Sequence, residues 1–540
     1  MSKIAEFLRS HISGEVTAAP DVRRSFAKDG SIVEIQPQVV VYPRTEQDIR
    51  KVARFSWQLA EKGKAFPVLT RGAGSSWNGA GVGDGISIIM TSHMHKILEL
   101  DTRKGEMLVE AGAIVGKLQQ ALITHGAFLP FEPLSSDFAT IGGVIATAAS
   151  GLRDLKYGGI SEAVESLRVV LSNGEIIDTK RLSKREVRKK MGLTTFEGDI
   201  YRSVDALFQE HGELINSYAG LKGTAGYNVF DVKQKDGSVD LTPLFLGAVG
   251  TLGIVTSAKV KTTAFNPMLS QLAIAFYSFD EFMTVAPQII KLSPSVFSVL
   301  DSSALEVFAR EQPLFFQKRF GDKIPELMVL VEWDEFSARS QKKAKSKLRK
   351  ILAKTDVRMI EMSDEKSRED HAKLFRIPSI LFQTELNQAK ATPGFESVRI
   401  SKESIKSFLA VAKDIFDKND VPAVFWWEYA TDEVRCFPYF DLRKLGHRQK
   451  CMQLLDEYYT AVLAHGGEVA ATGGGGRIAS LYARQQFGDV LYGVMEKVKT
   501  IFDPYNTLNP GIKINPDPKL LQTKMLQEYT LGYFNNHLYK

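Results

Sequence analysis

The chain has 540 residues, of which 44% are hydrophobic and 24% are charged, as in an ordinary globular protein. This length favours roughly two to four domains. The net charge of +6 is small, which excludes a protein devoted to binding nucleic acid. The two cysteines, Cys436 and Cys451, exclude a disulfide framework and an iron–sulfur motif, and they fit a reducing cytoplasm.

No apolar run approaches the ~20 residues that a membrane-spanning helix needs. The first ten residues carry charges where a signal peptide has its apolar core. We therefore expect a cytoplasmic protein.

The first 263 residues alternate predicted strands and helices. Residues 1–37 are predicted to form a short amphipathic helix and a polar lead-in. A strand follows at Val39–Pro43, and apolar periodicity predicts a helix from Thr45 to about Lys62, with Thr45 as its N-cap. Glycines between apolar runs mark the later turns.

From about residue 264 the pattern changes to strands paired with longer helices. The predicted strands are Leu272–Tyr277, Glu326–Glu332, Ala423–Trp427 and Val434–Pro438, and the predicted helices start at Phe279 and cover about 337–354 and 402–418. This order indicates an antiparallel sheet with helices on one face. The basic run Lys342–Lys350 has two interpretations, a solvated helix face or a patch that binds RNA or a membrane.

The most informative segment is the glycine-rich loop Arg71–Gly81, which lies between two apolar, strand-like runs. Glycines allow a positive φ and let backbone amides approach a ligand closely. A run of such amides can bind an anion, with Arg71, Ser75 and Ser76 as further donors. The loop alone is either a pyrophosphate cradle or a tight hairpin.

Three further glycine segments follow in the chain. Their sequences cover 130–159, 246–256 and 501–511. Gly142 and Gly143 permit close backbone approach to a planar ligand. Each segment is weak evidence by itself, whereas the four in this order are strong evidence for a cofactor site.

These motifs resemble the FAD-binding oxidoreductases of the vanillyl-alcohol oxidase superfamily, which carry a PCMH-type flavin domain. The likeness is greatest to the branch of glycolate oxidase flavin subunits, D-lactate dehydrogenases and D-2-hydroxyglutarate dehydrogenases. It implies an α+β chain with a two-subdomain FAD-binding domain over 38–263 and a ferredoxin-like cap, or substrate domain, over 264–469. A segment over 470–515 would return to the flavin, and an amphipathic tail would cover 516–540.

The resemblance also implies which residues bind FAD. Backbone amides of Gly72–Ser76 would hold the pyrophosphate, Ile254 would contact the adenine side, and Asn509 would close the site. Ser75 stands where some relatives carry a histidine that bonds covalently to flavin, so noncovalent FAD is expected. The complete expected set is Arg71, Gly72, Ala73, Gly74, Ser75, Ser76, Gly79, Pro133, Thr140, Gly142, Gly143, Ala146, Gly151, Gly253, Ile254 and Asn509.

The catalytic pattern of the 2-hydroxy acid branch is absent. That branch resembles a metal-assisted enzyme whose histidines and glutamate hold the metal and supply a base. Here Glu428 and Arg435 take the two histidine positions, and Thr472–Gly476 replaces the segment with the glutamate and the base. Because an arginine repels a bound cation, we expect a remodelled site without metal.

Three residues are candidates for catalysis. Arg376 lies where relatives grip the substrate carboxylate, a contact that suits a bidentate guanidinium. Glu428 would serve as base if burial raises its pKa, and Tyr429 if a cation lowers its own. Alternatively, Glu428 and Arg435 form a salt bridge. The glycines at 473–476 either widen the substrate site or mark an active site that has lost its chemistry.

These observations predict an FAD-dependent dehydrogenase that moves a hydride from a hydroxyl-bearing carbon, in a 2-hydroxy acid or a related carboxylate, to flavin N5. A metal-free alcohol, sugar or aldonolactone oxidase and an inactive flavin-binding protein are the alternatives. An ether-lipid synthase is disfavoured because those relatives carry a histidine run where this chain has glycines. The electron acceptor would be separate, namely a quinone, an electron-transfer protein or oxygen.

The C-terminal tail repeats Leu521, Met525 and Tyr529 on one face of a predicted helix. Two interpretations remain open. The tail docks on the protein's own surface or on a second copy in a homodimer, or it makes peripheral contact with the inner face of a membrane.

Overall fold

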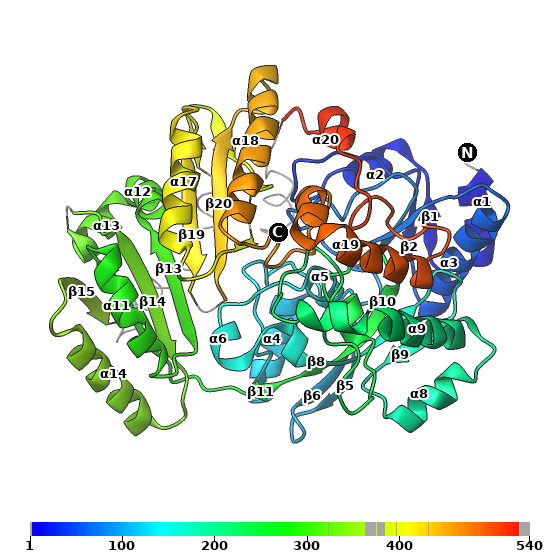
Figure 1. Ribbon diagram of the computed structural model, residues 1–540, viewed down its shortest axis with the longest axis horizontal. Helices are drawn as coiled ribbons and strands as arrows, with labels where there is room; N and C mark the ends of the chain where they lie inside the picture. Colours follow the sequence, from blue (N-terminus) through cyan, green and yellow to red (C-terminus); the bar gives the residue numbers. More distant parts are fainter. Residues whose placement is uncertain are drawn as a thin grey trace.

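The computed structural model describes residues 3–321, 323–361, 374, 384–395, 397–429 and 431–528. It shows two lobes joined side by side (Figure 1). We call residues 3–264 together with 470–528 the N-terminal lobe, and residues 270–469 the cap. Among the helices within the described ranges, none combines the length and the apolarity needed to cross a bilayer.

The first sheet of the N-terminal lobe has four strands in the order β1-β2-β4-β3. Strands β2, β4 and β3 run parallel, and β1 is antiparallel. The strands are β1 (Glu15–Thr17), β2 (Val39–Tyr42), β3 (Val68–Arg71) and β4 (Ile86–Ile89). Helix α3 (Glu46–Glu61) starts where the sequence predicts, because the hydroxyl of Thr45 accepts from the amide of Asp48 in a capping box.

The N-terminal residues are more than a polar lead-in. Helix α1 (Lys3–His11) buries Ala5 and Leu8 against this sheet, and β1 adds a strand to it. Helix α2 (Pro20–Ser25) follows. The predicted boundary at residue 37 therefore cuts through one packed unit, because α1 and β1 share a hydrophobic core with β2.

The second sheet is antiparallel, with five strands in the order β5-β6-β10-β8-β9. The strands are β5 (Ile97–Asp101), β6 (Glu106–Glu110), β8 (Val164–Val170), β9 (Ile176–Thr179) and β10 (Ile254–Lys261). The helices of this part are α4 (Val115–Ile123), α5 (Ile141–Thr147), α6 (Asp154–Tyr157), α7 (Ile160–Ala163), α8 (Lys184–Met191), α9 (Phe196–Ser217) and α10 (Thr242–Phe245). A short pair, β7 (Ala127–Phe128) with β11 (Thr263–Ala264), leads toward the cap.

The cap is built on one antiparallel sheet whose strands differ in length. Their order is β15-β12-β14-β13-β19-β20-β17-β16, with β18 beside β20. The strands are β12 (Ser270–Phe276), β13 (Val296–Asp301), β14 (Leu327–Trp333), β15 (Val357–Glu361), β16 (Glu385–Leu386), β17 (Ala389–Ala391), β18 (Val398–Arg399), β19 (Ala423–Glu428) and β20 (Glu433–Phe440). The predicted hairpin is β19–β20. Strand β13, at the centre of the sheet, was not predicted; all six of its residues are buried, so it lacks the alternation that marks an exposed strand.

Helices α11 (Phe279–Ile290), α14 (Ala338–Leu352), α17 (Ile405–Asp417) and α18 (Leu445–Ala464) cover one face of this sheet (Figure 1). Helices α12 (Ser302–Glu311) and α13 (Pro313–Phe320) pack on part of the other face. The remainder of that second face lies against the N-terminal lobe. The expected antiparallel sheet with helices on one face is therefore extended by two helices on the opposite side.

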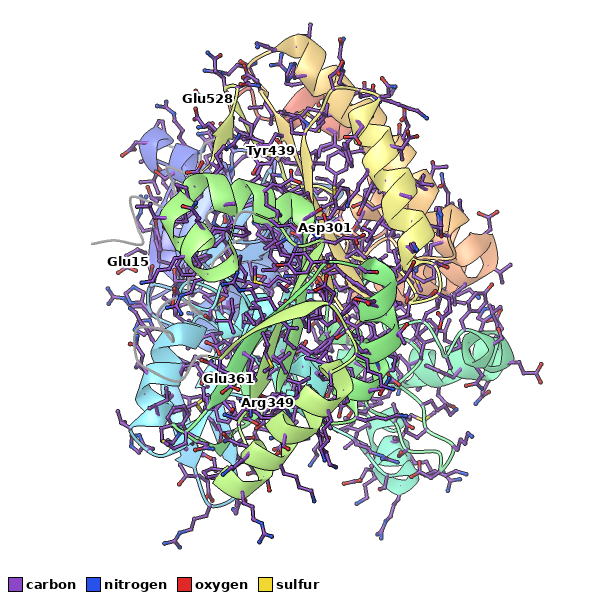
Figure 2. All side chains as sticks on the ribbon, turned by 90° about the vertical axis from the view of Figure 1, so that its left-hand side faces the viewer. Glu15, Asp301, Arg349, Glu361, Tyr439 and Glu528 are labelled. Carbon is purple, nitrogen blue, oxygen red and sulfur yellow. The ribbon has the colours of Figure 1, made fainter. Side chains whose placement is uncertain are left out.

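The basic run of α14 lies on the outer side of the cap. Figure 2 shows Arg349 beside Glu361 there, and both Arg349 and Lys345 form ion pairs with Glu361. Lys342, Lys343 and neighbouring cations are exposed. The helix buries Leu348 and Leu352 against the sheet, so the basic residues form its outward face.

The two lobes are tied together by charged groups at α6. Arg153 pairs with Glu132 in its own lobe at 2.9 Å and with Glu332 on cap strand β14 at 3.0 Å. Lys156 pairs with Asp334 at 2.5 Å, and the hydroxyl of Tyr157 donates to the same carboxylate at 2.6 Å. These contacts fix the face of the cap sheet over the N-terminal lobe.

Replacing Arg153 by methionine should therefore destabilise the protein by about 3 kcal/mol, because it leaves the buried Glu332 carboxylate without its cation. The matched control is Arg181→Met, which breaks the exposed pair with Asp236 and should cost less than about 1 kcal/mol. Urea titration followed by circular dichroism measures both. Equal losses of unfolding free energy for the two variants would show that the ion pairs of Arg153 contribute no more to stability than an exposed pair.

The C-terminal segment returns to the N-terminal lobe. Helix α19 (Ala483–Phe502) packs on α9, and the end of α20 (Lys519–Lys524) meets the N-terminal segment, where the amide of Glu34 donates to the carbonyl of Lys524 at 2.8 Å. Leu521 and Leu526 are buried, and the amide of Leu526 donates to the carbonyl of Ile32 at 2.8 Å. The predicted tail helix ends early, at Lys524, where the chain pairs with the lobe instead. Tyr529 lies outside the described residues.

Candidate active site

The glycine-rich loop begins where β3 ends. Within the described residues, none of the backbone amides from Gly72 to Ser76 donates to a protein atom. Gly74 has a φ of 71°, a conformation that favours glycine. Five consecutive half-buried amides without protein acceptors are available to donate to an anionic ligand. The loop has the donors that a pyrophosphate requires.

Arg71 does not add to those donors, which corrects the expectation from the sequence. Its guanidinium donates to the carbonyls of Phe26, Lys28 and Gly81 and lies over the ring of Phe26. The residue is 2% exposed. Arg71 therefore holds the loop against the N-terminal segment and leaves the anion to the backbone.

A pocket opens beside this loop, between β3, α5 and the turn that enters β10. Its second wall is α5, whose N-cap Thr140 accepts from the amide of Gly143 at 3.1 Å. Glycines and alanines dominate the lining, which leaves room for a flat ligand against the backbone. The lining residues are Thr70, Arg71, Gly72, Met90, Ala111, Thr140, Gly142, Gly143, Ala146, Phe245, Ala248, Gly250, Gly253 and Val255.

Seven of the expected residues are thus brought together at the pocket, namely Arg71, Gly72, Thr140, Gly142, Gly143, Ala146 and Gly253. Thr70, Met90, Ala111, Phe245, Ala248, Gly250 and Val255 were missed. Four of these come from strand ends or helix neighbours that carry no motif, so only the folded chain shows them at the pocket.

Other expected cofactor residues support the pocket from outside it. Pro133 and Gly151 pair with each other in an isolated bridge, and Ile254 is buried at the start of β10. The side-chain amide of Asn509 donates to the carbonyls of Ala80 at 3.1 Å and Val249 at 2.8 Å. Asn509 therefore joins the glycine loop to the turn before β10. Ala73, Ser75, Ser76 and Gly79 belong to the glycine loop itself.

The loop Gly473–Gly476 lies against the same pocket. All four glycines have a positive φ, between 58° and 86°. The amide of Gly473 donates to the carbonyl of Thr147, which follows Ala146 at the pocket wall. Arg477 then donates to the carbonyls of Gly79 at 3.0 Å and Val82 at 2.8 Å. The segment is fastened to the cofactor loop, although a Cβ at 473 would meet no atom within 4 Å.

The cap hairpin turns one face toward this region. Trp426 and Glu428 on β19 stand opposite Arg435 and Glu433 on β20, and side chains at alternate positions share a face. The ring of Phe437, also on this face, meets Trp77 of the glycine loop at 5.2 Å. The predicted candidates Glu428 and Arg435 therefore face the N-terminal lobe.

Arg435 pairs with Glu433, not with Glu428. Its guanidinium lies 2.9 Å from the Glu433 carboxylate and donates to Ser150 at 2.7 Å. Ser150, Ser397 and Thr472 each donate to the same carboxylate. Burial opposes ionisation, yet the charge of Arg435 and these hydroxyls hold the pKa of Glu433 below its usual value. The expected Glu428–Arg435 salt bridge is not formed.

Glu433 is the central group that sequence reasoning missed. It is the first residue of β20 and has no motif around it, and its hydroxyl partners come from three distant segments of the chain. The available signal was a glutamate two residues before an arginine at a predicted strand. Alternate side chains share one face of a strand, and a charged group rarely stays buried unpaired.

Glu428 has a different environment. It accepts from the hydroxyl of Ser298 on β13 at 2.7 Å and keeps accessible surface, whereas Glu433 has none. Burial raises the pKa of Glu428 to about 7, against the charge of Arg435. Asp154, on the opposite lobe, is raised to a pKa of about 7 by burial as well.

Tyr429 is removed from the candidate set. Its ring packs between Phe282 and Phe297 on the helix-covered face of the sheet, away from the N-terminal lobe. Burial raises the pKa of Tyr429, which is opposite to what a tyrosine base requires. Arg376 lies outside the described residues.

The residues present fit FAD. The free amides of Gly72–Ser76 suit its pyrophosphate, and the glycine-lined pocket suits a flat ring. Among the residues that the structure describes, no group of three or more His, Cys, Asp or Glu side chains is arranged to hold a metal ion. Glu428 and Arg435 occupy the two hairpin positions that correspond to the metal-binding histidines of the 2-hydroxy acid branch.

Comparison with known proteins agrees with this arrangement. The chain matches the model of the FAD binding domain over residues 37–180 and that of the FAD linked oxidases, C-terminal domain, over residues 270–512. A D-2-hydroxyglutarate dehydrogenase of Pantoea ananatis is 27% identical, covering 92% of this chain and 50% of its own length. The glycolate oxidase subunit GlcD of Bacillus subtilis is 26% identical, covering 88% of each chain.

The chain spans about half the length of the first of these relatives. Among solved structures, p-cresol methylhydroxylase with substrate bound superposes with a TM-score of 0.70 at 15% identity, covering 95% of this chain and 96% of the other, which shows the shared fold. The chain therefore carries a region similar to the FAD binding domain, followed by one similar to the C-terminal domain of FAD linked oxidases, in the fold that it shares with p-cresol methylhydroxylase.

Proposed function

We propose that this chain is an FAD-dependent dehydrogenase that oxidises a 2-hydroxy acid to the 2-oxo acid. The observation that carries the proposal is the glycine-lined pocket with five free amides, set against a cap face that bears ionisable side chains. Relatives named for D-2-hydroxyglutarate and glycolate support this substrate class.

Bound FAD would accept the hydride from the substrate carbon. Gly72–Ser76 would hold its pyrophosphate, and Gly142, Gly143 and Ala146 would face its ring system. Because Ser75 cannot form the covalent histidine link of some relatives, the cofactor would be held without a covalent bond. The chain would need a separate electron acceptor, a quinone, an electron-transfer protein or oxygen.

The substrate carboxylate would be gripped by Arg376, since the guanidinium of Arg435 is already paired with Glu433. Residues 519–526 dock on the N-terminal lobe, which supports the interpretation that the tail packs on the protein's own surface. Contact with a second copy and peripheral contact with the inner face of a membrane stay predictions.

Purified protein should be yellow, and acid precipitation should release its flavin into the supernatant. Under anaerobic conditions, D-2-hydroxyglutarate, D-lactate or glycolate should bleach the flavin absorbance in a stopped-flow instrument. Aldoses and aromatic alcohols provide the comparison panel. Bleaching by sugars alone would replace the proposal with a sugar oxidase, and photoreduction without bleaching by any substrate would indicate a structural flavin.

A further inference from the structure

Between the cap face and the N-terminal lobe lies a second carboxylate, that of Glu428, which is not part of the Glu433–Arg435 ion pair. Arg435 and Glu433 neutralise each other within a shell of hydroxyls from Ser150, Ser397 and Thr472. Glu428 stands across the hairpin from Glu433, and its partner in this part of the structure is the hydroxyl of Ser298.

We propose that Glu428 is the residue that accepts the substrate's hydroxyl proton, and that the Glu433–Arg435 pair is a positioning element that takes the place of a metal centre. The inference rests on the proposed function. It identifies the group that takes up the hydroxyl proton in a site where Glu428 and Arg435 replace the two histidines of the 2-hydroxy acid branch.

The chemistry requires one such group. Oxidation of the alcohol removes two electrons as a hydride from the carbon, for which FAD is the oxidant, and one proton from the hydroxyl oxygen. The proton goes to the carboxylate of Glu428, which becomes a neutral carboxyl, and the C–O single bond becomes the carbonyl of the 2-oxo acid. Solvent recovers the proton before the next turnover.

The surroundings of Glu428 suit proton exchange. The Ser298 hydroxyl can donate to the carboxylate and accept from the carboxyl, so Glu428 stays hydrogen-bonded in both forms. Among the described residues, the charged groups that act on it are Arg435 and Glu433 from β20 and Asp154 from α6. Since Glu433 cancels much of the charge of Arg435, burial determines the titration and places it near neutral pH.

Asp154 is the competing carboxylate, but its geometry is that of a turn. One oxygen accepts from the amide of Gly151 at 2.9 Å and closes the turn that starts α6. The other oxygen, Oδ1, has no hydrogen-bond partner among the described residues. Asp154 and Glu428 therefore provide a matched pair of carboxylates with similar pKa values and different roles.

The test compares wild type with Glu428→Gln, Asp154→Asn and Tyr429→Phe as holoenzymes. Glu428→Gln should slow anaerobic flavin bleaching by a 2-hydroxy acid about 10²- to 10⁴-fold, with flavin content kept. The wild-type bleaching rate should rise with pH through about 7, and Glu428→Gln should lose this rise, whereas Tyr429→Phe should keep both rate and profile. Bleaching by Glu428→Gln at the wild-type rate would overturn the inference.

Infrared difference spectroscopy supplies a readout that needs no substrate. A neutral-carboxyl band should disappear as the pH is raised from about 5 to 9, and Glu428→Gln should remove a component that Asp154→Asn leaves in place. A titrating band that is unchanged in Glu428→Gln would overturn the inference. If the wild-type flavin is bleached by no 2-hydroxy acid, the proposed function fails, and the infrared result still decides whether Glu428 exchanges a proton near neutral pH.

Discussion

Replacing Gly476 by alanine should destabilise the protein by at least about 3 kcal/mol and should abolish retention of FAD. Its φ is 58°, a conformation that costs a residue with a Cβ on the order of 1–2 kcal/mol. The new Cβ would also overlap the backbone carbonyl oxygen of Asn78, which cannot rotate away. Because Asn78 and Arg477 connect this turn to the pyrophosphate loop, the strain would displace both segments.

Gly473→Ala is the matched control in the same loop. Its φ is 86°, but a Cβ there would meet no atom within 4 Å, so only the conformational cost of about 1–2 kcal/mol applies. The thermal midpoint and the flavin-to-protein absorbance ratio measure both effects. Similar thermal midpoints and absorbance ratios for the two variants would mean that the loop moves to relieve the close contact at 476, so that a glycine is not required there.

Lys513 should make the stability of the protein rise with pH through neutrality. The residue is 1% exposed, and its ammonium donates to the carbonyls of Thr224 and of Gly474. Among the described residues, no carboxylate forms an ion pair with it. Burial lowers the pKa of Lys513 to about 7, and a neutral amine still has the two N–H groups that these carbonyls need.

The sign of the effect follows from proton binding. Between pH 7 and about 10.4, the unfolded chain keeps a proton on this lysine that the folded chain has released, so stability rises with pH in that window. The full difference is on the order of 4 kcal/mol. Lys513→Met should remove this slope, being more stable than wild type below pH 7 and less stable near pH 10.

Urea titrations at several pH values would measure the slope, with Lys497→Met as the control. Lys497 is exposed and pairs with Glu210, so its removal should leave the slope unchanged. Stability curves that run parallel for wild type and Lys513→Met would show that Lys513 stays protonated in the folded protein.

The catalytic candidates show how far sequence reasoning reached and where it stopped. Counting along the hairpin placed Glu428 and Arg435 correctly on one face, because side chains alternate along a strand. The same alternation separates Tyr429 from Glu428, because adjacent residues on a strand point to opposite faces, so Tyr429 should not have been grouped with Glu428 as a candidate base. The partner of Arg435 also escaped, since Glu433, Ser150, Ser397 and Thr472 meet only through the approach of two lobes.

From the sequence by itself, local chemistry determined single elements, such as the helix capped at Thr45 and the glycine turns at strand ends, because capping and turn formation act within a few residues. The cofactor, the α+β class and the order of the lobes followed from the resemblance of the four glycine segments, taken together, to a flavoprotein family. Only the tertiary structure decided what the side chains do. Arg71, predicted to bind the ligand, is a buried anchor whose guanidinium bonds to backbone carbonyls distant in the chain. Burial likewise lowers the pKa of Lys513, an effect that depends on the folded environment of the side chain.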